Sequence, residues 1–190
     1  AYVRTLQIDG ETGLLNVSQD VENRCLVCKV ELTNTRPLMK VVEKVRTLFD
    51  LDADPSEINQ CLSENGELTD LIAENPGQRL PGAWDPFEVA VRAIVGQQVS
   101  VKGATTVMSR IVDRYGERIG ETVLFPTPES LAALSVENLS MPNKRAQAIK
   151  DMADAVVRGE IELARSNSSE ILIGQMTAIK GIGPWTAQYV

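Results

Sequence analysis

The chain has no histidine, only 4% aromatic residues and three cysteines among its 190 residues. The absence of histidine removes the commonest side-chain ligand of zinc. Three cysteines do not make an even disulfide framework, which indicates a reducing compartment. No apolar run approaches the roughly 18 residues that a membrane-spanning helix needs, and no signal peptide is predicted at Ala1. These absences predict a globular protein and argue against a membrane protein, a secreted protein and a small disulfide-rich domain.

Cys25 and Cys28 have the C-x-x-C spacing that many zinc sites use. The run 24–32 that contains them alternates like a β-strand, and only Cys61 remains as a further ligand. We therefore predict no zinc site.

The net charge of −7 is unevenly distributed along the chain. Residues 1–78 carry 7 Lys and Arg against 14 Asp and Glu, whereas residues 79–190 carry 12 against 12. The second part is thus neutral overall, with a basic cluster at Lys144, Arg145 and Lys150. Such a cluster permits a local DNA-binding face, and a solvated helix face explains it about as well.

Hydrophobic periodicity changes along the chain from two residues to about 3.6. Near the N-terminus it predicts a β-meander, followed by a helix that Pro37 opens. After a turn at 75–77 it predicts helices only. The predicted strands cover 2–8, 14–18 and 24–32, and the predicted helices cover 86–98, 101–115, 128–134, 143–158, 169–178 and 184 onward. The fold class is therefore α+β, a small antiparallel meander with a helix followed by an all-α bundle.

Residues 179–190 form the most distinctive string, Ile-Lys-Gly-Ile-Gly-Pro-Trp-Thr-Ala-Gln-Tyr-Val. Gly181 and Gly183 mark a turn predicted to be too tight for side chains, and Pro184 suits the first position of a helix. A second helix is expected to enter the turn. The glycine amides then point outward at the positive end of a helix dipole, where a phosphate fits. As a bare pattern, Gly-x-Gly is more often a simple turn.

The whole string resembles the helix-hairpin-helix of the base-excision DNA glycosylases, and most of all the bacterial DNA-3-methyladenine glycosylase II family. Four further segments occur in the order that this family shows: 79–82 (Arg-Leu-Pro-Gly), 87–101, 125–128 (Phe-Pro-Thr-Pro) and 141–146 (Met-Pro-Asn-Lys-Arg-Ala). The resemblance is strong from Arg79 onward and weaker before it.

The resemblance implies three regions: a partial N-terminal α+β module over 1–50, an acidic connector with short helices over 51–78, and a helix-hairpin-helix glycosylase domain over 79–190. Because the family has further elements at both ends, we expect the chain to be truncated at both.

The resemblance also implies a DNA-binding site. The residue that matches Gln98 enters the duplex and fills the space that a flipped nucleotide leaves, although relatives often carry a bulky apolar residue there. From spacing alone, residues 97–100 are an ordinary polar helix end. The further DNA-binding residues implied are Gln97, Ser100, Lys144, Gly181, Gly183 and Thr186. The backbone carbonyls of Thr177, Ile179 and Gly181 are expected to hold a monovalent Na⁺ or K⁺ ion, and no cofactor is required.

Trp185 and Tyr189 lie four residues apart on the last helix, so their rings share a face. Two such aromatics pack in a core about as often as they line a pocket, and their position after the hairpin favours a pocket. Flat rings are what an enzyme needs to hold a base drawn out of a duplex, and they attract a positively charged base by about 1–2 kcal/mol when desolvated.

A positively charged alkylated purine is a good leaving group, so its release needs no general acid, only a carboxylate that stabilises the sugar cation. In the family this aspartate follows the helix that begins at Pro184. It is therefore expected beyond Val190, and the chain alone is expected to be inactive. Asp85 is interpreted as an N-cap, and Asp151 and Asp154 as polar helix-face residues.

The resemblance thus implies a monofunctional glycosylase, because Trp185 stands where bifunctional relatives carry a Schiff-base lysine. It would hydrolyse the N-glycosidic bond of flipped alkylated purines in duplex DNA, as a monomer in the bacterial cytoplasm, at the nucleoid, with no membrane partner. The alternative is a non-catalytic DNA-binding or regulatory module on the same fold.

Overall fold

The computed structural model describes residues 1–64, 66–139, 141–163 and 168–190. Contacts between residues divide the chain into two compact units. One unit is 34–84, and the other joins 1–33 with 85–190. The predicted domain ranges of 1–50, 51–78 and 79–190 follow composition and resemblance rather than these contacts, and they stay a prediction.

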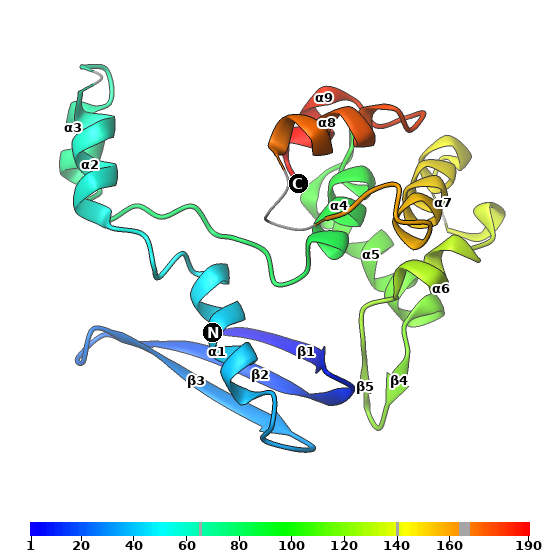
Figure 1. Cartoon of the computed structure of the whole chain (residues 1–190), viewed down its shortest axis with the longest axis horizontal. Helices are drawn as coiled ribbons and strands as arrows, with labels where there is room; N and C mark the ends of the chain where they lie inside the picture. The colour runs from blue at the N-terminus through cyan, green and yellow to red at the C-terminus, as the bar shows by residue number, and fades with distance from the viewer. Residues whose placement is uncertain (65, 140, 164–167) are drawn as a thin grey trace. The chain divides into compact units, whose positions relative to one another are not determined.

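The N-terminal sheet is an antiparallel meander in the order β1-β2-β3, as predicted (Figure 1). Its strands are β1 (Tyr2–Ile8), β2 (Glu11–Asp20) and β3 (Cys25–Leu32). The register pairs Leu6 with Gly13 and Leu15 with Val30. One face carries the buried side chains of the sheet, which are Leu6, Ile8, Leu15 and Val17. Cys25 and Cys28 are three residues apart on β3, so their thiols lie on opposite faces of the sheet.

Residues 34–84 contain three helices, α1 (Leu38–Leu48), α2 (Pro55–Ser63) and α3 (Thr69–Glu74). The segment after α3 returns to α1, where the Gly82 amide donates to the Leu48 carbonyl at 2.9 Å. The Lys44 ammonium donates to the Trp84 carbonyl at 2.8 Å and lies over the indole ring of the same residue. These contacts close the unit on itself.

The helical part follows from residue 85. Its elements are α4 (Pro86–Val95), α5 (Val101–Tyr115), β4 (Arg118–Ile119), β5 (Thr122–Val123), α6 (Pro128–Ala132), a 3₁₀ helix (Val136–Asn138), α7 (Asn143–Val157), α8 (Ser169–Thr177) and α9 (Pro184–Gln188). As predicted, the Asp85 carboxylate caps α4 by accepting from the Phe87 amide at 2.9 Å. None of the helices in the described ranges combines the length and apolar character that a bilayer span needs.

Helix α4 stops at Val95, three residues before the predicted end at Gln98. Gly96 follows, and Gln98 adopts a left-handed conformation with φ of 54°, which no helix continues. The difference arises because glutamine is a good helix former, so the helical pattern of the sequence continues past Gly96. A turn thus separates α4 from α5 and carries the residues that the resemblance assigned to DNA.

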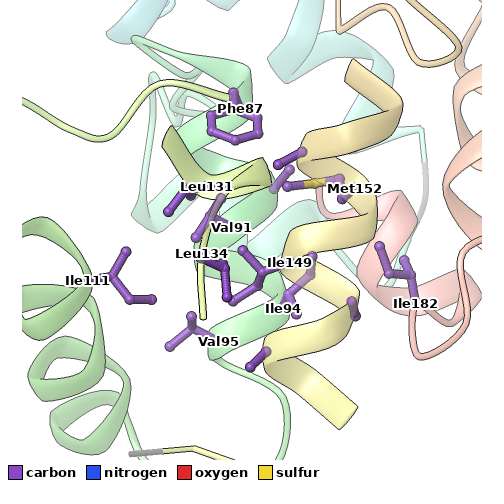
Figure 2. Close-up of a cluster of buried hydrophobic side chains, with 14 of the residues drawn as sticks. Phe87, Val91, Ile94, Val95, Ile111, Leu131, Leu134, Ile149, Met152 and Ile182 are labelled. Carbon is purple, nitrogen blue, oxygen red and sulfur yellow. The ribbon is translucent and has the colours of Figure 1, made fainter. Parts of the chain in front are cut away.

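The core of the helical part joins α4, α5, α6, α7 and the α8–α9 hairpin (Figure 2). It is made of aliphatic side chains, with Phe87 at one end in edge-to-face contact with Phe125. The labelled members in Figure 2 are Phe87, Val91, Ile94, Val95, Ile111, Leu131, Leu134, Ile149, Met152 and Ile182, each of them buried. Because Ile182 belongs to this core, the same packing that stabilises the bundle also anchors the hairpin.

Candidate nucleic-acid interface

The predicted helix-hairpin-helix is present. Helix α8 ends at Thr177, the chain turns over 178–183, and α9 begins at Pro184 with Gly183 as its N-cap. The Ile182 amide donates to the Ile179 carbonyl at 3.1 Å, which closes the turn. Within the described part of the chain, no hydrogen bond is made by the backbone amides of Gly181 and Gly183. Both amides are therefore available to an oxygen ligand.

Gly181 and Gly183 differ in how strongly the fold itself requires glycine. Gly181 has φ of +99°, a left-handed conformation in which a side chain is strained. A Cβ there would lie 3.4 Å from the Cβ of Ala148, which is an ordinary van der Waals contact. Gly183 has φ of −89°, and a Cβ there would meet nothing within 4 Å. The expectation that the turn is too tight for side chains is wrong for Gly183, and at Gly181 it is the backbone conformation, not a lack of space, that favours glycine. The protein's own structure leaves open space beside Gly183, on an exposed surface.

Gln97 connects the end of α4 to the hairpin. Its Nε2 donates to the Gly181 carbonyl at 3.0 Å and lies 3.1 Å from Oγ1 of Thr186. Thr186 is buried, with 4% of its surface exposed. Sequence reasoning assigned both side chains to DNA. The structure places them together in a contact between the α4–α5 turn and α9, and direct DNA contact by either one stays a prediction.

The carbonyls predicted to hold a cation are partly engaged. The Ile179 carbonyl accepts from the Ile182 amide, and the Gly181 carbonyl accepts from Gln97. Each carbonyl oxygen has a second lone pair, so the set with Thr177 retains the capacity to bind a hard cation. The residues therefore fit such an ion in donor chemistry, and its presence stays a prediction.

Gln98 stands exposed at the tip of the α4–α5 turn. A left-handed backbone at a residue other than glycine or asparagine costs about 1 kcal/mol, and such strain clusters at functional sites. Ser100 follows as the N-cap of α5, where its hydroxyl oxygen accepts from the Gly103 amide at 3.2 Å. Asp9, Arg24 and Asp50 share this left-handed conformation, so the entry of Gln98 into the duplex stays a prediction.

Lys144 lies in the first turn of α7, next to the hairpin. Its side chain is exposed, and its carbonyl oxygen is 3.8 Å from the position that a Cβ on Gly181 would occupy. Arg145 and Lys150 of the predicted basic cluster are only partly exposed. The structure thus places the backbone of Lys144, the exposed residue of the cluster, near Gly181 in the turn.

The two aromatic side chains are on the surface. Trp185 is 69% exposed and Tyr189 is 61% exposed, and their rings are stacked with centroids 5.8 Å apart at 22°. This decides against core packing for the pair. The rings line one side of an open pocket of about 320 Å³, and its other lining residues come from α4, α5 and the turn between them: Arg92, Ala93, Gly96, Val99, Val101, Ala104, Thr105 and Met108.

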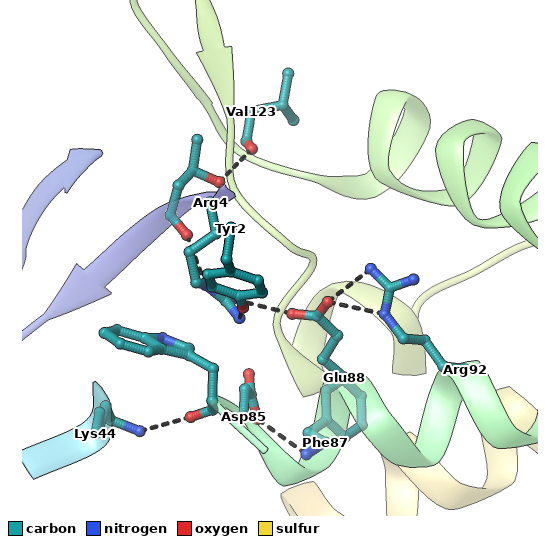
Figure 3. Close-up of polar contacts among 10 residues, drawn as sticks. Tyr2, Arg4, Lys44, Asp85, Phe87, Glu88, Arg92 and Val123 are labelled. Atoms are coloured by element: carbon teal, nitrogen blue, oxygen red, sulfur yellow. Dashed lines mark hydrogen bonds and ion pairs between the residues drawn. The ribbon is translucent and has the colours of Figure 1, made fainter. Parts of the chain in front are cut away.

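A charged cluster that sequence reasoning missed lies at this pocket. Both Arg92 Nε and Nη2 donate to Oε1 of Glu88, at 2.9 Å and 2.7 Å. The other carboxylate oxygen of Glu88 accepts from Nη2 of Arg4 in β1 at 3.0 Å. Figure 3 shows Glu88 between the two guanidinium groups. The i, i+4 spacing of Glu88 and Arg92 was a local signal for one half of the cluster.

Taken together, the meander, the helical bundle, the α8–α9 hairpin and the exposed aromatic pocket define a protein of the helix-hairpin-helix DNA glycosylase class. Two family models match the chain: "AlkA N-terminal domain" over residues 1–85 and "HhH-GPD superfamily base excision DNA repair protein" over residues 91–184. The chain belongs to this superfamily, in the group of the DNA-3-methyladenine glycosylase 2 relatives. The predicted family and fold class are confirmed.

Three relatives illustrate the similarity. The chain is 34% identical over 194 residues to DNA-3-methyladenine glycosylase 2 of Escherichia coli, covering 99% of the chain and 67% of that protein. It is 34% identical over 196 residues to the probable bifunctional transcriptional activator/DNA repair enzyme AlkA of Mycobacterium tuberculosis, covering 100% of the chain and 39% of that protein. The solved 3-methyladenine DNA-glycosylase from Archaeoglobus fulgidus superposes with a TM-score of 0.80 at 25% identity, covering 98% of the chain and 66% of that structure. The chain therefore spans between about two fifths and two thirds of the length of these relatives.

Proposed function

We propose that this chain binds duplex DNA through the α8–α9 hairpin and receives a flipped, alkylated purine between α4, α5 and the Trp185–Tyr189 pair. The observation that carries the proposal is that these two aromatic rings are stacked and exposed beside a pocket. Exposed aromatic surface costs free energy in water, and a flipped base recovers it by stacking. The unpaired amides of Gly181 and Gly183 supply the contact to a phosphate.

In the whole protein the reaction is hydrolysis of the N-glycosidic bond of the flipped base. The electron-rich rings favour a positively charged base, which leaves without protonation, so the site needs no general acid. Trp185 has no amine for a Schiff base, which makes the enzyme monofunctional. Hydrolysis needs a carboxylate to stabilise the developing sugar cation.

That carboxylate is not contributed by the pocket lining described above, which contains no Asp or Glu. Glu88, which holds Arg92, has both of its oxygens in ion pairs. The aspartate that the family resemblance implies therefore belongs to a part of the protein other than this pocket lining. The 190-residue chain by itself is expected to bind damaged DNA and to release no base.

The remaining properties follow from the same proposal. The protein acts as a monomer in the bacterial cytoplasm, at the nucleoid. It requires no cofactor. The backbone carbonyls of Thr177, Ile179 and Gly181 would hold a Na⁺ or K⁺ ion, whose positive charge would attract a phosphate. The support for the ion is the carbonyl donor set and the exposed turn.

The proposal is tested by the affinity of the chain for two matched duplexes, one undamaged and one with a single N7-methylguanine whose sugar carries a 2′-fluorine. The fluorine slows bond cleavage, so binding alone is measured. Tighter binding to the damaged duplex, lost in Trp185→Ala, supports the proposal. Equal binding to both duplexes contradicts it.

The second candidate is a DNA-binding or regulatory module without glycosylase activity. The name of the Mycobacterium tuberculosis relative, which includes a transcriptional activator, is the observation that favours it. Equal affinity for damaged and undamaged duplex, together with preference for one DNA sequence, would support this candidate.

A further inference from the structure

We propose that Tyr189 is a positioning residue that holds the indole of Trp185 in place, and that Trp185 alone stacks on the flipped base. This inference rests on the proposed function, since it divides the work of one pocket wall between its two aromatic side chains. The starting observation is that the two rings already stack on each other, with centroids 5.8 Å apart and planes inclined by 22°. Each ring therefore has one face covered by the other ring.

The space between the two rings is too narrow for a base. Carbon atoms in contact are about 3.5 Å apart, so a base held between two rings would separate the ring planes by about 7 Å. The separation of the planes cannot exceed the 5.8 Å between the centroids. The pair is therefore one wall of the pocket, and a base can stack only on an outward face, either that of Trp185 or that of Tyr189.

The order of the residues along α9 favours the face of Trp185. Both rings belong to the pocket lining, so the lining alone does not distinguish them. Gly183 is the N-cap of α9, Trp185 follows two residues later, and Tyr189 is the C-cap, about 6 Å further along the helix axis. A nucleotide whose phosphate is bound by the amides of Gly181 and Gly183 places its base nearer to Trp185. The Tyr189 ring then lies behind the indole, on the face turned away from the base.

The indole of Trp185 needs such a support because little else holds it. Trp185 is 69% exposed, so most of its surface is in water. The backbone fixes the spacing of the two side chains, since the Tyr189 amide donates to the Trp185 carbonyl at 3.2 Å. The stacked tyrosine ring then limits rotation of the indole about its side-chain bonds. An indole that is ordered before the base arrives loses less side-chain freedom on binding, which raises the affinity.

The test is a double-mutant cycle in the 190-residue chain, measured by fluorescence anisotropy of the DNA. The probes are the duplex with 2′-fluoro N7-methylguanine and the matched undamaged duplex, and the quantity compared is the ratio of the two affinities. Tyr189→Leu removes the supporting ring, whereas Tyr189→Phe keeps it. Trp185→Leu provides the second background, because leucine keeps an apolar contact with the base and has no ring for Tyr189 to orient. Far-ultraviolet circular dichroism checks that each variant is folded.

We expect Tyr189→Leu to lower the ratio by about threefold, the effect of one lost aromatic pair. Tyr189→Phe should retain the wild-type ratio, because the ring rather than the hydroxyl supports the indole. In the Trp185→Leu background, Tyr189→Leu should cause no further loss.

The free chain gives a second, spectroscopic result. Tyr189→Leu should speed the rotation of the Trp185 indole, whereas Tyr189→Phe should not. Time-resolved fluorescence anisotropy measures this rotation after the signal of the Trp185→Phe variant is subtracted.

An equal loss on Tyr189→Leu in both backgrounds would overturn the inference, since Tyr189 would then contact the base directly. So would an unchanged ratio in the single Tyr189→Leu variant, or an indole that rotates no faster in that variant. These outcomes leave the proposed function standing, because the wild-type chain still prefers the damaged duplex. Equal binding of the damaged and undamaged duplexes by the wild-type chain would overturn the proposed function and this inference with it.

Discussion

The side-chain amide of Gln97 joins the α4–α5 turn to the α8–α9 hairpin, because its Nε2 lies 3.1 Å from the buried hydroxyl oxygen of Thr186 and 3.0 Å from the Gly181 carbonyl. This contact sets the α4–α5 turn, with Gln98 at its tip, against the hairpin. The two parts predicted to touch DNA are thus braced by one side chain.

Gln97→Ala should lower the free energy of unfolding by about 1–2 kcal/mol, since it leaves the buried Thr186 hydroxyl without its partner. The expected fall in Tm is about 5 °C for a chain of this size. The matched control is Gln147→Ala, whose amide bonds Asp151 on an exposed helix face and should change stability by no more than about 0.5 kcal/mol. An equal fall in Tm for the two variants would show that the Gln97 side chain does not stabilise the contact between the turn and the hairpin.

Gly183→Ala should leave stability unchanged, because a Cβ at this position meets no protein atom within 4 Å. It should weaken binding of undamaged duplex by about fivefold, since the methyl group occupies the space of the phosphate that the turn amides bind. The loss should not depend on DNA sequence or damage. Anisotropy titrations measure it.

Gly181→Ala is the contrasting variant, because the positive φ at this position predicts a loss of stability. A folded Gly183→Ala variant that binds undamaged duplex as tightly as wild type would refute the assignment of the hairpin as a phosphate clamp.

Gln98→Gly should raise the free energy of unfolding by about 1 kcal/mol, because glycine adopts the left-handed conformation without strain. It should at the same time weaken binding to damaged duplex, since no side chain remains to fill the gap in the base stack. Arg24→Gly in the β2–β3 turn, also at positive φ, should give the gain in stability without the change in preference for damaged over undamaged duplex. Retained preference in Gln98→Gly would exclude an intercalating role.

Trp185→Ala should reduce affinity for duplex with N7-methylguanine more than for duplex with neutral hypoxanthine, both on 2′-fluoro sugars. Only the charged base loses a cation–π attraction of about 1–2 kcal/mol, which corresponds to roughly a 5- to 30-fold difference. Equal losses for the two duplexes would mean that the ring contributes stacking area without selecting for charge.

The sequence predicted the hairpin well because its determinants are local. Glycine at positive φ, proline at the first helical position and the apolar spacing on both sides all lie within a few residues of one another. The meander was predictable for the same reason. The two-residue strands β4 and β5 and the 3₁₀ helix were missed, since they are too short to show a periodicity.

The parts of the site that depend on distant contacts were not predictable. Gln97 meets Gly181 and Thr186 across 84 and 89 residues of sequence, and Arg4 meets Glu88 across 84. Spacing also left two possibilities for Trp185 and Tyr189, because a helix face shared by two rings suits a core or a pocket equally. Only their exposure in the folded chain decides for the pocket.

The most direct test of the central claim is the fluorescence of Trp185 during titration with duplex that holds one 2′-fluoro N7-methylguanine. Trp84, the other tryptophan, is 5% exposed, and the signal of the Trp185→Phe variant subtracts its contribution. A flipped base stacked on the Trp185–Tyr189 pair predicts strong quenching of Trp185 by the damaged duplex and little by the undamaged one at equal saturation. Unchanged Trp185 emission, while anisotropy shows the damaged duplex bound, would contradict the account.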